Sequence, residues 1–193
     1  QGDAASFIVN PAAELQLNAS AAGASALVVQ GNIPSNATWD LRFRLGFAPS
    51  TSNLLRIFLM SDQQDLANAN AYFLEIGESG TTDALRLFRQ DGAVKTLLGT
   101  GEAGLVALNP DIHLLVTRTL SGQWTVEAAS GTGALTPQFS ATDATYPGGP
   151  NRFFGFQCVY TVSNITKYFF DDITIALGAP DTDPPTLLSA AAD

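Results

Sequence analysis

Apolar and polar residues alternate with a period of two along much of this chain, most regularly over residues 38–47. There every second side chain from Trp39 to Phe47 is large and apolar, and the intervening positions include Asp40 and Arg42. Successive side chains of a β-strand point to opposite faces, so this pattern predicts a strand with one buried and one polar face. No stretch sustains the helical period. The chain is therefore expected to fold as β-sheet.

Other apolar or alternating runs have the length of strands, and turn-forming residues separate them. Asp91-Gly92 and Ser121-Gly122 each join two runs as a tight hairpin, and all ten prolines fall between runs. About a dozen short strands of this kind predict an all-β fold, an antiparallel sandwich or barrel. The further runs are 6–10, 14–18, 26–30, 54–60, 71–76, 84–90, 94–98, 112–119, 123–128, 152–161 and 167–177.

The length and composition favour one packed domain. The chain has 193 residues, of which 46% are apolar and 14% charged, so disorder is not expected. Residues 1–178 are predicted to form a β-sandwich domain. Residues 179–193 begin with an acidic, proline-rich stretch that cannot enter a sheet, and they are interpreted as a linker and the start of a following module.

The charge and the scarcity of histidine and cysteine exclude several classes of function. A formal net charge of −9 repels phosphate backbones, so no nucleic-acid partner is expected. No apolar stretch approaches the roughly 18 residues of a membrane helix, so no membrane insertion is expected. One Cys and one His leave almost nothing for a zinc site, a thiol relay or a histidine base.

The N-terminus and the residue usage indicate an extracellular protein. The first residues carry neither a Met nor the basic and apolar regions of a signal peptide, as expected if one has been removed. Only two lysines accompany abundant Ala, Thr, Ser, Asn and Gly. A secreted or cell-surface location on a bacterium is therefore predicted.

A glycine-rich motif and the single cysteine each suggest a function, nucleotide binding and nucleophilic catalysis, that the surrounding residues do not support. Residues 99–104 match the glycine pattern of dinucleotide-binding loops, but a strand rather than a helix follows, so no helix N-terminus is available for a phosphate. Cys158 lies among aromatic and aliphatic residues and is interpreted as a small buried hydrophobe. Nothing near it in the sequence activates a thiol, although pairing with His113 stays open.

Glycoside hydrolysis requires two cooperating carboxylates. Asp171 and Asp172 are adjacent in a predicted strand, so their side chains are expected on opposite faces. No strand carries acidic residues at alternate positions. No catalytic residue is therefore predicted, and the chain is not expected to be an enzyme.

Calcium is the cofactor that the sequence allows, because it needs only oxygen ligands. Residues 61–70 offer carboxylates and amides in one loop, without the spacing of an EF-hand. A structural calcium ion held by Asp62 and Asp65 is a possibility that this loop leaves open.

Alternation also gathers rings and ionic groups on one sheet face. If the alternate positions Leu55, Ile57 and Leu59 face the core, the residues between them point the other way. The same alternation divides the predicted strands at 71–76, 84–90 and 152–161 into an inward and an outward set. Aromatic rings mixed with Arg, Glu and Gln bind sugars by stacking and by directional hydrogen bonds. The seven candidate residues are Arg56, Phe58, Phe73, Glu75, Arg86, Phe88 and Gln157.

The residues of four segments carry a resemblance to a known kind of domain. Segments 56–62, 72–77, 85–92 and 168–175 resemble the β-sandwich module near the start of large secreted surface proteins of Bacteroidetes-type bacteria, and more distantly the concanavalin A and laminin-G jelly rolls. The resemblance implies two facing antiparallel sheets, a concave sheet that often binds glycans, sometimes a calcium ion at the rim, and further modules in the same chain.

The leading hypothesis is a non-catalytic carbohydrate-binding module with a two-sheet, concanavalin A-like jelly-roll sandwich. It would bind polysaccharide through the seven candidate residues. Two alternatives stay open: a structural or adhesive spacer whose face is covered by a neighbouring module, and a polysaccharide-cleaving jelly-roll enzyme. A third interpretation of the face itself is that loops of the same domain cover it.

Overall fold

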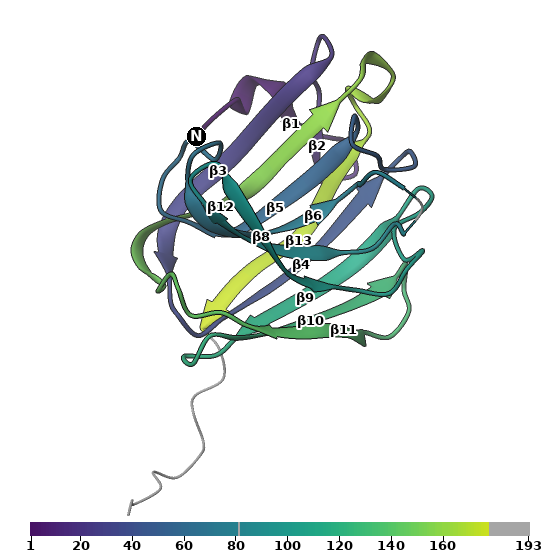
Figure 1. Ribbon diagram of the computed structural model, residues 1–193. Helices are drawn as coiled ribbons and strands as arrows, with labels where there is room; N and C mark the ends of the chain where they lie inside the picture. Colours follow the sequence, from purple (N-terminus) through teal and green to yellow (C-terminus); the bar gives the residue numbers. More distant parts are fainter. Residues whose placement is uncertain (81, 178–193) are drawn as a thin grey trace, which may run out of the picture.

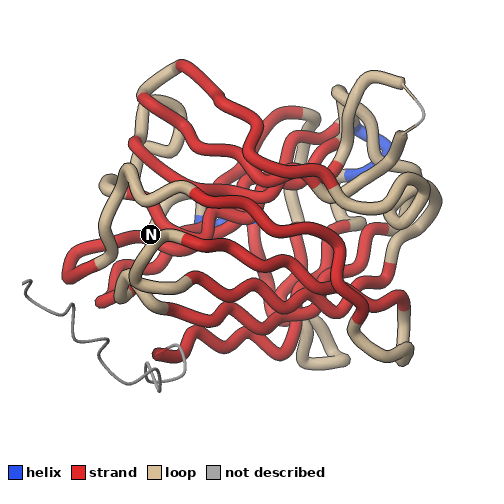
Figure 2. Tube along the Cα trace, turned by 60° about the horizontal axis from the view of Figure 1, so that its bottom comes forward, coloured by secondary structure: helices blue, strands red, loops and turns tan. Residues whose placement is uncertain are grey.

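The computed structural model describes residues 1–80 and 82–177, and strands make up most of this chain (Figure 1). Only two short 3-10 helices interrupt them in the described part, Ala4–Ser6 and Val162–Asn164. Figure 2 shows the strands running through the body of the domain, with the loops at its ends. The predicted linker at 179–193 lies outside the described residues.

The strands form two antiparallel sheets, as the alternation predicted. The seven-stranded sheet contains, in spatial order, β1 (Phe7–Val9), β2 (Leu15–Leu17), β13 (Tyr168–Leu177), β4 (Ala37–Leu45), β9 (Asp111–Arg118), β10 (Gln123–Ser130) and β11 (Thr136–Thr142). The six-stranded sheet contains β3 (Gly23–Ile33), β12 (Gly149–Tyr160), β5 (Leu54–Ser61), β6 (Asn70–Ile76), β7 (Arg86–Asp91) and β8 (Val94–Thr100). The predicted all-β sandwich is confirmed.

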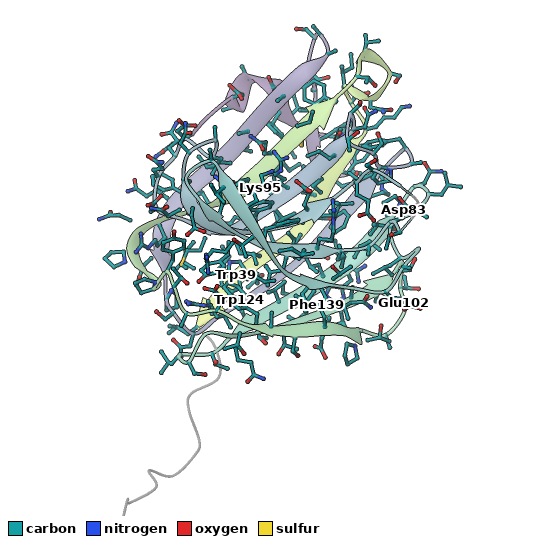
Figure 3. All side chains as sticks on the ribbon, in the orientation of Figure 1. Trp39, Asp83, Lys95, Glu102, Trp124 and Phe139 are labelled. Atoms are coloured by element: carbon teal, nitrogen blue, oxygen red, sulfur yellow. The ribbon has the colours of Figure 1, made fainter. Side chains whose placement is uncertain are left out.

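The main core lies between the two sheets and is rich in aromatic rings. Phe156 of β12 stacks on Phe170 of β13 with 3.9 Å between ring centroids, so this pair joins the sheets directly. Trp39 of β4 stacks on Trp124 of β10 at 5.7 Å, and both are labelled in Figure 3. Burial of these large side chains supplies much of the hydrophobic stabilisation of the sandwich.

The edges of the two sheets meet on one side of the sandwich. A Cβ atom built on Gly99 of β8 would lie 2.3 Å from the Phe139 ring of β11, so only a glycine leaves room for that ring. β8 belongs to the six-stranded sheet and β11 to the seven-stranded one. Phe139 therefore closes this side of the core.

The strand boundaries follow the sequence pattern closely in most places. β4 alternates between buried and half-buried residues along its whole length, and Gly92 and Gly122 take positive φ angles in the two predicted hairpins. The pattern missed β11, which carries Pro137 and lacks regular alternation. β11 lies at the edge of its sheet, where a missing N–H group is tolerated.

A bulge interrupts β13 near its middle. Asp172 has a φ angle of 50°, and the pairing with β4 shifts register between Asp171 and Thr174. The predicted opposite orientation of Asp171 and Asp172 assumed regular alternation, which the bulge removes; both residues are exposed. An extra residue inserted into one strand is the usual cause of such a break.

Candidate functional site

The outer face of the six-stranded sheet brings the seven candidate residues together. Arg56 of β5 lies opposite Glu75 of β6 and Gln157 of β12, and Glu75 lies opposite Arg86 of β7. Phe73 of β6 likewise lies opposite Phe58 of β5 on one side and Phe88 of β7 on the other. Rings and ionic groups from four strands therefore emerge on one side, as the alternation predicted. The alternation also placed Met60 on this face, which is wrong, because a bulge in β5 between Phe58 and Met60 turns Met60 into the main core.

Three phenylalanines form a stacked row along this face. The ring centroids of Phe58 and Phe73 are 5.0 Å apart, and those of Phe73 and Phe88 are 5.3 Å apart. Phe58 is 1% exposed and Phe73 0%, whereas Phe88 is only half-buried. Phe58 and Phe73 therefore have no exposed ring face for a ligand, and Phe88 is the ring of this row that is in contact with solvent.

The loop between β5 and β6 covers one end of the face. Leu66 and Ala69 of this loop are buried against Phe58 and Phe73 in a second hydrophobic cluster, separate from the main core. The Nε2 atom of Gln90 donates hydrogen bonds to the carbonyl oxygens of Leu66 at 2.8 Å and Ala69 at 3.2 Å. Because these bonds are buried, they hold the loop firmly in place.

The other end of the face carries a group of paired charges, which we call the Glu75 cluster. The Oε2 atom of Glu75 accepts a bond from Nε of Arg56 at 2.7 Å, and its Oε1 atom accepts one from Nη2 of Arg86 at 3.0 Å. Nη1 of Arg86 also lies 3.1 Å from Oε2 of Glu78. The cluster consists of Arg56, Glu75, Glu78, Arg86 and Lys95.

Lys95 of β8 is the member that the sequence analysis did not identify. Lys95 is labelled in Figure 3. Its Nζ atom lies 3.5 Å from Oε2 of Glu75 and 5.2 Å from the centre of the Phe73 ring. Burial lowers the pKa of Lys95, the charge of Arg56 lowers it further, and the carboxylate of Glu75 opposes both. The sequence could have identified this residue, because pairing the two strands across the Asp91-Gly92 hairpin places Lys95 opposite Gln90, an outward-facing position of β7.

The two side chains suggested for calcium are occupied within their own loop. Both carboxylate oxygens of Asp62 accept bonds from Asn70, each at 2.9 Å, and Asp65 accepts the backbone N–H of Ala67 at 3.1 Å. Within residues 1–80 and 82–177, no group of three His, Cys, Asp or Glu side chains is placed to hold a metal ion. Asp62 and Asp65 as described therefore do not fit a calcium site.

The residues considered for nucleophilic catalysis lie on different sides of the seven-stranded sheet, because Cys158 is in the core and His113 alternates with the core residues Ile112 and Leu114. Cys158 is buried in the core between the sheets, and this burial raises the pKa of its thiol well above the usual value. His113 is half-buried on β9, where its Nε2 atom lies 2.7 Å from Oδ1 of Asp40. The open possibility of a Cys158–His113 pair is therefore wrong.

Two small hollows lie elsewhere on the described surface. One of about 170 Å³ lies over β4 and β13 and is lined by residues that include Glu14, Arg44 and Phe169. Arg44 stacks on the Phe169 ring, 3.8 Å from its centre, and also bonds Glu14 at 3.0 Å. The second, of about 110 Å³, lies beside Tyr146 and Arg152. Both are small for an oligosaccharide.

Comparison with solved structures finds carbohydrate-binding domains of low sequence identity. The exoplasmic/lumenal domain of VIP36, in a form with Ca²⁺ and Man3GlcNAc bound, superposes with a TM-score of 0.71 at 12% identity, over 95% of this chain and 85% of that one. The legume lectin-like domain from Entamoeba histolytica gives 0.61 at 12%, over 91% and 87%. The carbohydrate-binding module CBM66 from Bacillus subtilis gives 0.57 at 12%, over 88% and 89%.

No protein-family model and no curated protein sequence matches the chain. Both helical segments of the described residues are single turns, too short to cross a bilayer. At 12% identity, the likeness to solved structures concerns the fold alone. The chain has the concanavalin A-like jelly-roll fold that these lectin-like domains share.

Proposed function

We propose that this domain is a non-catalytic carbohydrate-binding module of a secreted or cell-surface protein, and that it binds polysaccharide on the outer face of the six-stranded sheet. The observation that carries the proposal is the arrangement of Arg56, Arg86 and Gln157 around a stacked aromatic row. The lectin-like neighbours, which include sugar-bound forms, support the same class of ligand.

Each part of the face has a distinct role in the proposal. Phe88 offers its half-exposed ring to the apolar face of a sugar, while Phe58 and Phe73 form the buried floor behind it. Arg56 donates to both Glu75 and Gln157, so its guanidinium is held in one orientation before a ligand arrives. A side chain fixed in this way loses little further entropy on binding a sugar hydroxyl.

The domain's own β5–β6 loop weakens the alternative that this domain is a structural spacer covered by a neighbouring module. Phe58 and Phe73 are already buried against Leu66 and Ala69, so no neighbouring module is needed to cover them. Only Phe88 and the rim of the Glu75 cluster are left for a ligand. We also propose that the parent protein carries further modules, with this domain anchoring it to glycan.

The non-catalytic part of the proposal follows from how the carboxylates on this face are used. Glu75 accepts bonds from two arginines, and Glu78 pairs with Arg86. Both therefore serve to position cations, whereas a glycosidase needs one carboxyl to donate a proton and another to attack or activate water.

A polysaccharide panel tests the proposal, read by calorimetry on the wild type and two matched variants. Individual contacts contribute about 1 kcal/mol, so affinities on the order of micromolar to millimolar are expected for one oligosaccharide. Phe88→Leu removes the ring and retains the apolar bulk, and should weaken binding about fivefold. Phe169→Leu makes the same change on the other sheet and should have no effect.

Two results would overturn the proposal. One is a panel of neutral and acidic polysaccharides that produces no response from the wild-type domain. The other is binding that Phe169→Leu weakens and Phe88→Leu leaves unchanged, which would move the site to the seven-stranded sheet. Melting temperatures of both variants show whether either change has disturbed the fold.

A further inference from the structure

We propose that the glycan bound by this face is anionic, and that Lys95 binds its carboxylate or sulfate group. The inference rests on the proposed function, because it names the chemical class of ligand for the same site. It is carried by the unequal pairing of charges in the Glu75 cluster.

The cluster is a positive region on an acidic protein. Three cations, Arg56, Arg86 and Lys95, share two carboxylates, Glu75 and Glu78, which leaves one uncompensated positive charge. The protein as a whole has a net charge of −9. Asp62 bonds Asn70, which lies at the opposite end of β6 from Glu75. An anion is thus favoured at the cluster and disfavoured over most of the surface.

Lys95 is the cation with the weakest pairing. In the part of the chain that the structure describes, its only hydrogen-bond partner is Oε2 of Glu75 at 3.5 Å, and Nε of Arg56 already occupies that oxygen at 2.7 Å. An ammonium group has three N–H donors, so two are available to a ligand. The side chain is 34% exposed, so a bound group can reach it from solvent.

The surroundings of Lys95 strengthen its attraction for an anion. Burial and the neighbouring charges of Arg56 and Arg86 lower its pKa, because the positive neighbours and lost hydration outweigh the single carboxylate of Glu75. A ligand carboxylate or sulfate would relieve this repulsion, whereas a neutral hydroxyl would not. Phe88, next to Phe73 in the row, offers the adjacent stacking surface for the sugar ring that carries the charge.

The test compares glycans that differ only in charge. Polygalacturonate is set against its fully methyl-esterified form, and dextran sulfate against dextran, in affinity electrophoresis and calorimetry. The two pairs distinguish a carboxylate from a sulfate. We expect one charged member to bind at least tenfold more tightly than its neutral partner, which corresponds to about 1.4 kcal/mol.

The chain offers a matched control, because Lys95 and Lys167 are its only lysines. Lys95→Gln should reduce affinity for the charged glycan about tenfold and leave affinity for its neutral partner unchanged. Lys167→Gln makes the same change in net charge on the side chain that packs beside Gly46, and should leave both affinities unchanged.

The outcomes separate this inference from the proposed function. Equal binding of charged and neutral partners, or a Lys95→Gln domain that binds the charged glycan like the wild type, overturns the inference. If Phe88→Leu still weakens binding of a neutral glycan in that case, the proposed function stands. If no charged or neutral glycan binds, both fail.

Discussion

Glu75→Gln is the change that most severely tests the account of the outer face. Glu75 holds Arg56 at 2.7 Å, Arg86 at 3.0 Å and Lys95 at 3.5 Å, and its side chain is only 11% exposed. Hydrogen bonds to a charged group contribute about 1.5 to 3 kcal/mol each, and removing one partner of a buried ion pair costs about 3 to 5 kcal/mol.

The structure reduces that cost in three ways. Arg56 retains its bond to Gln157, and Arg86 retains Glu78 and the carbonyl oxygen of Gly77. Lys95 is exposed enough to recover hydration, and the new amide oxygen can accept one of the lost bonds. We therefore expect the free energy of unfolding to fall by about 2 kcal/mol and the melting temperature by about 4 to 8 °C.

The same variant should bind anionic glycan more tightly, because the cluster gains a second uncompensated positive charge. Urea unfolding and calorimetric titration with polygalacturonate measure the two effects. Glu127→Gln, half-buried on β10 in the other sheet, is the control for net charge. A loss of stability below about 0.5 kcal/mol, the range of ordinary surface changes, would refute the reasoning that Glu75 organises these cations.

Three further predictions follow from other parts of the structure. Burial raises the pKa of Asp143, but hydrogen bonds from Tyr72 at 2.5 Å, from Thr145 and from Arg89 at 2.6 Å outweigh it, so this pKa is lowered overall. The stability that Asp143 contributes is present above its unfolded pKa near 4 and lost as the pH falls through its folded pKa, so Asp143→Asn should show a shallower loss of stability in acid urea titrations than the wild type. Gly155→Ala should lower the free energy of unfolding by about 2 kcal/mol or more, because the added Cβ would lie 2.2 Å from a carbonyl oxygen of β3. Gly31→Ala is the control: no atom lies within 4 Å of its added Cβ, so the free energy of unfolding should hardly change in the same assay. Added calcium or a chelator should move the melting temperature by less than about 1 °C. A calcium-dependent rise of several degrees would contradict the conclusion that Asp62 and Asp65 do not fit a calcium site.

Local periodicity predicted the sheets well, because the side chains of a regular strand must alternate. Most of the predicted run 38–47 lies in β4 (Ala37–Leu45), and the seven candidate residues share one face of β5, β6, β7 and β12. The expected outward position of Met60 was wrong, because a bulge in β5 between Phe58 and Met60 turns this side chain into the main core. Periodicity failed where the backbone departs from a regular strand. The bulge at Asp172 removed the alternation that separated it from Asp171, and β11 has no regular pattern to detect.

The burial of the face could not be predicted from the strands alone. It depends on the covering loop, whose Leu66 and Ala69 carbonyl oxygens are bonded by Gln90, a residue 24 and 21 positions later in the sequence. It also depends on Lys95 of β8, which contacts Glu75 of β6. Leu66, the one large apolar residue of this loop, was a local sign that the segment packs against the sheet. Contacts between residues distant in the sequence decide which of the aligned rings is open to a ligand.

The central claim is that carbohydrate binds on the outer face of the six-stranded sheet, and amide chemical-shift mapping tests it most directly. The ¹⁵N-labelled domain is titrated with whichever glycan of the panel binds. We predict that the largest shifts fall on β7 and β8, near Phe88 and Lys95, with smaller ones at Arg56 and Gln157. Shifts confined to β4, β9 and β13 of the opposite sheet would contradict the account.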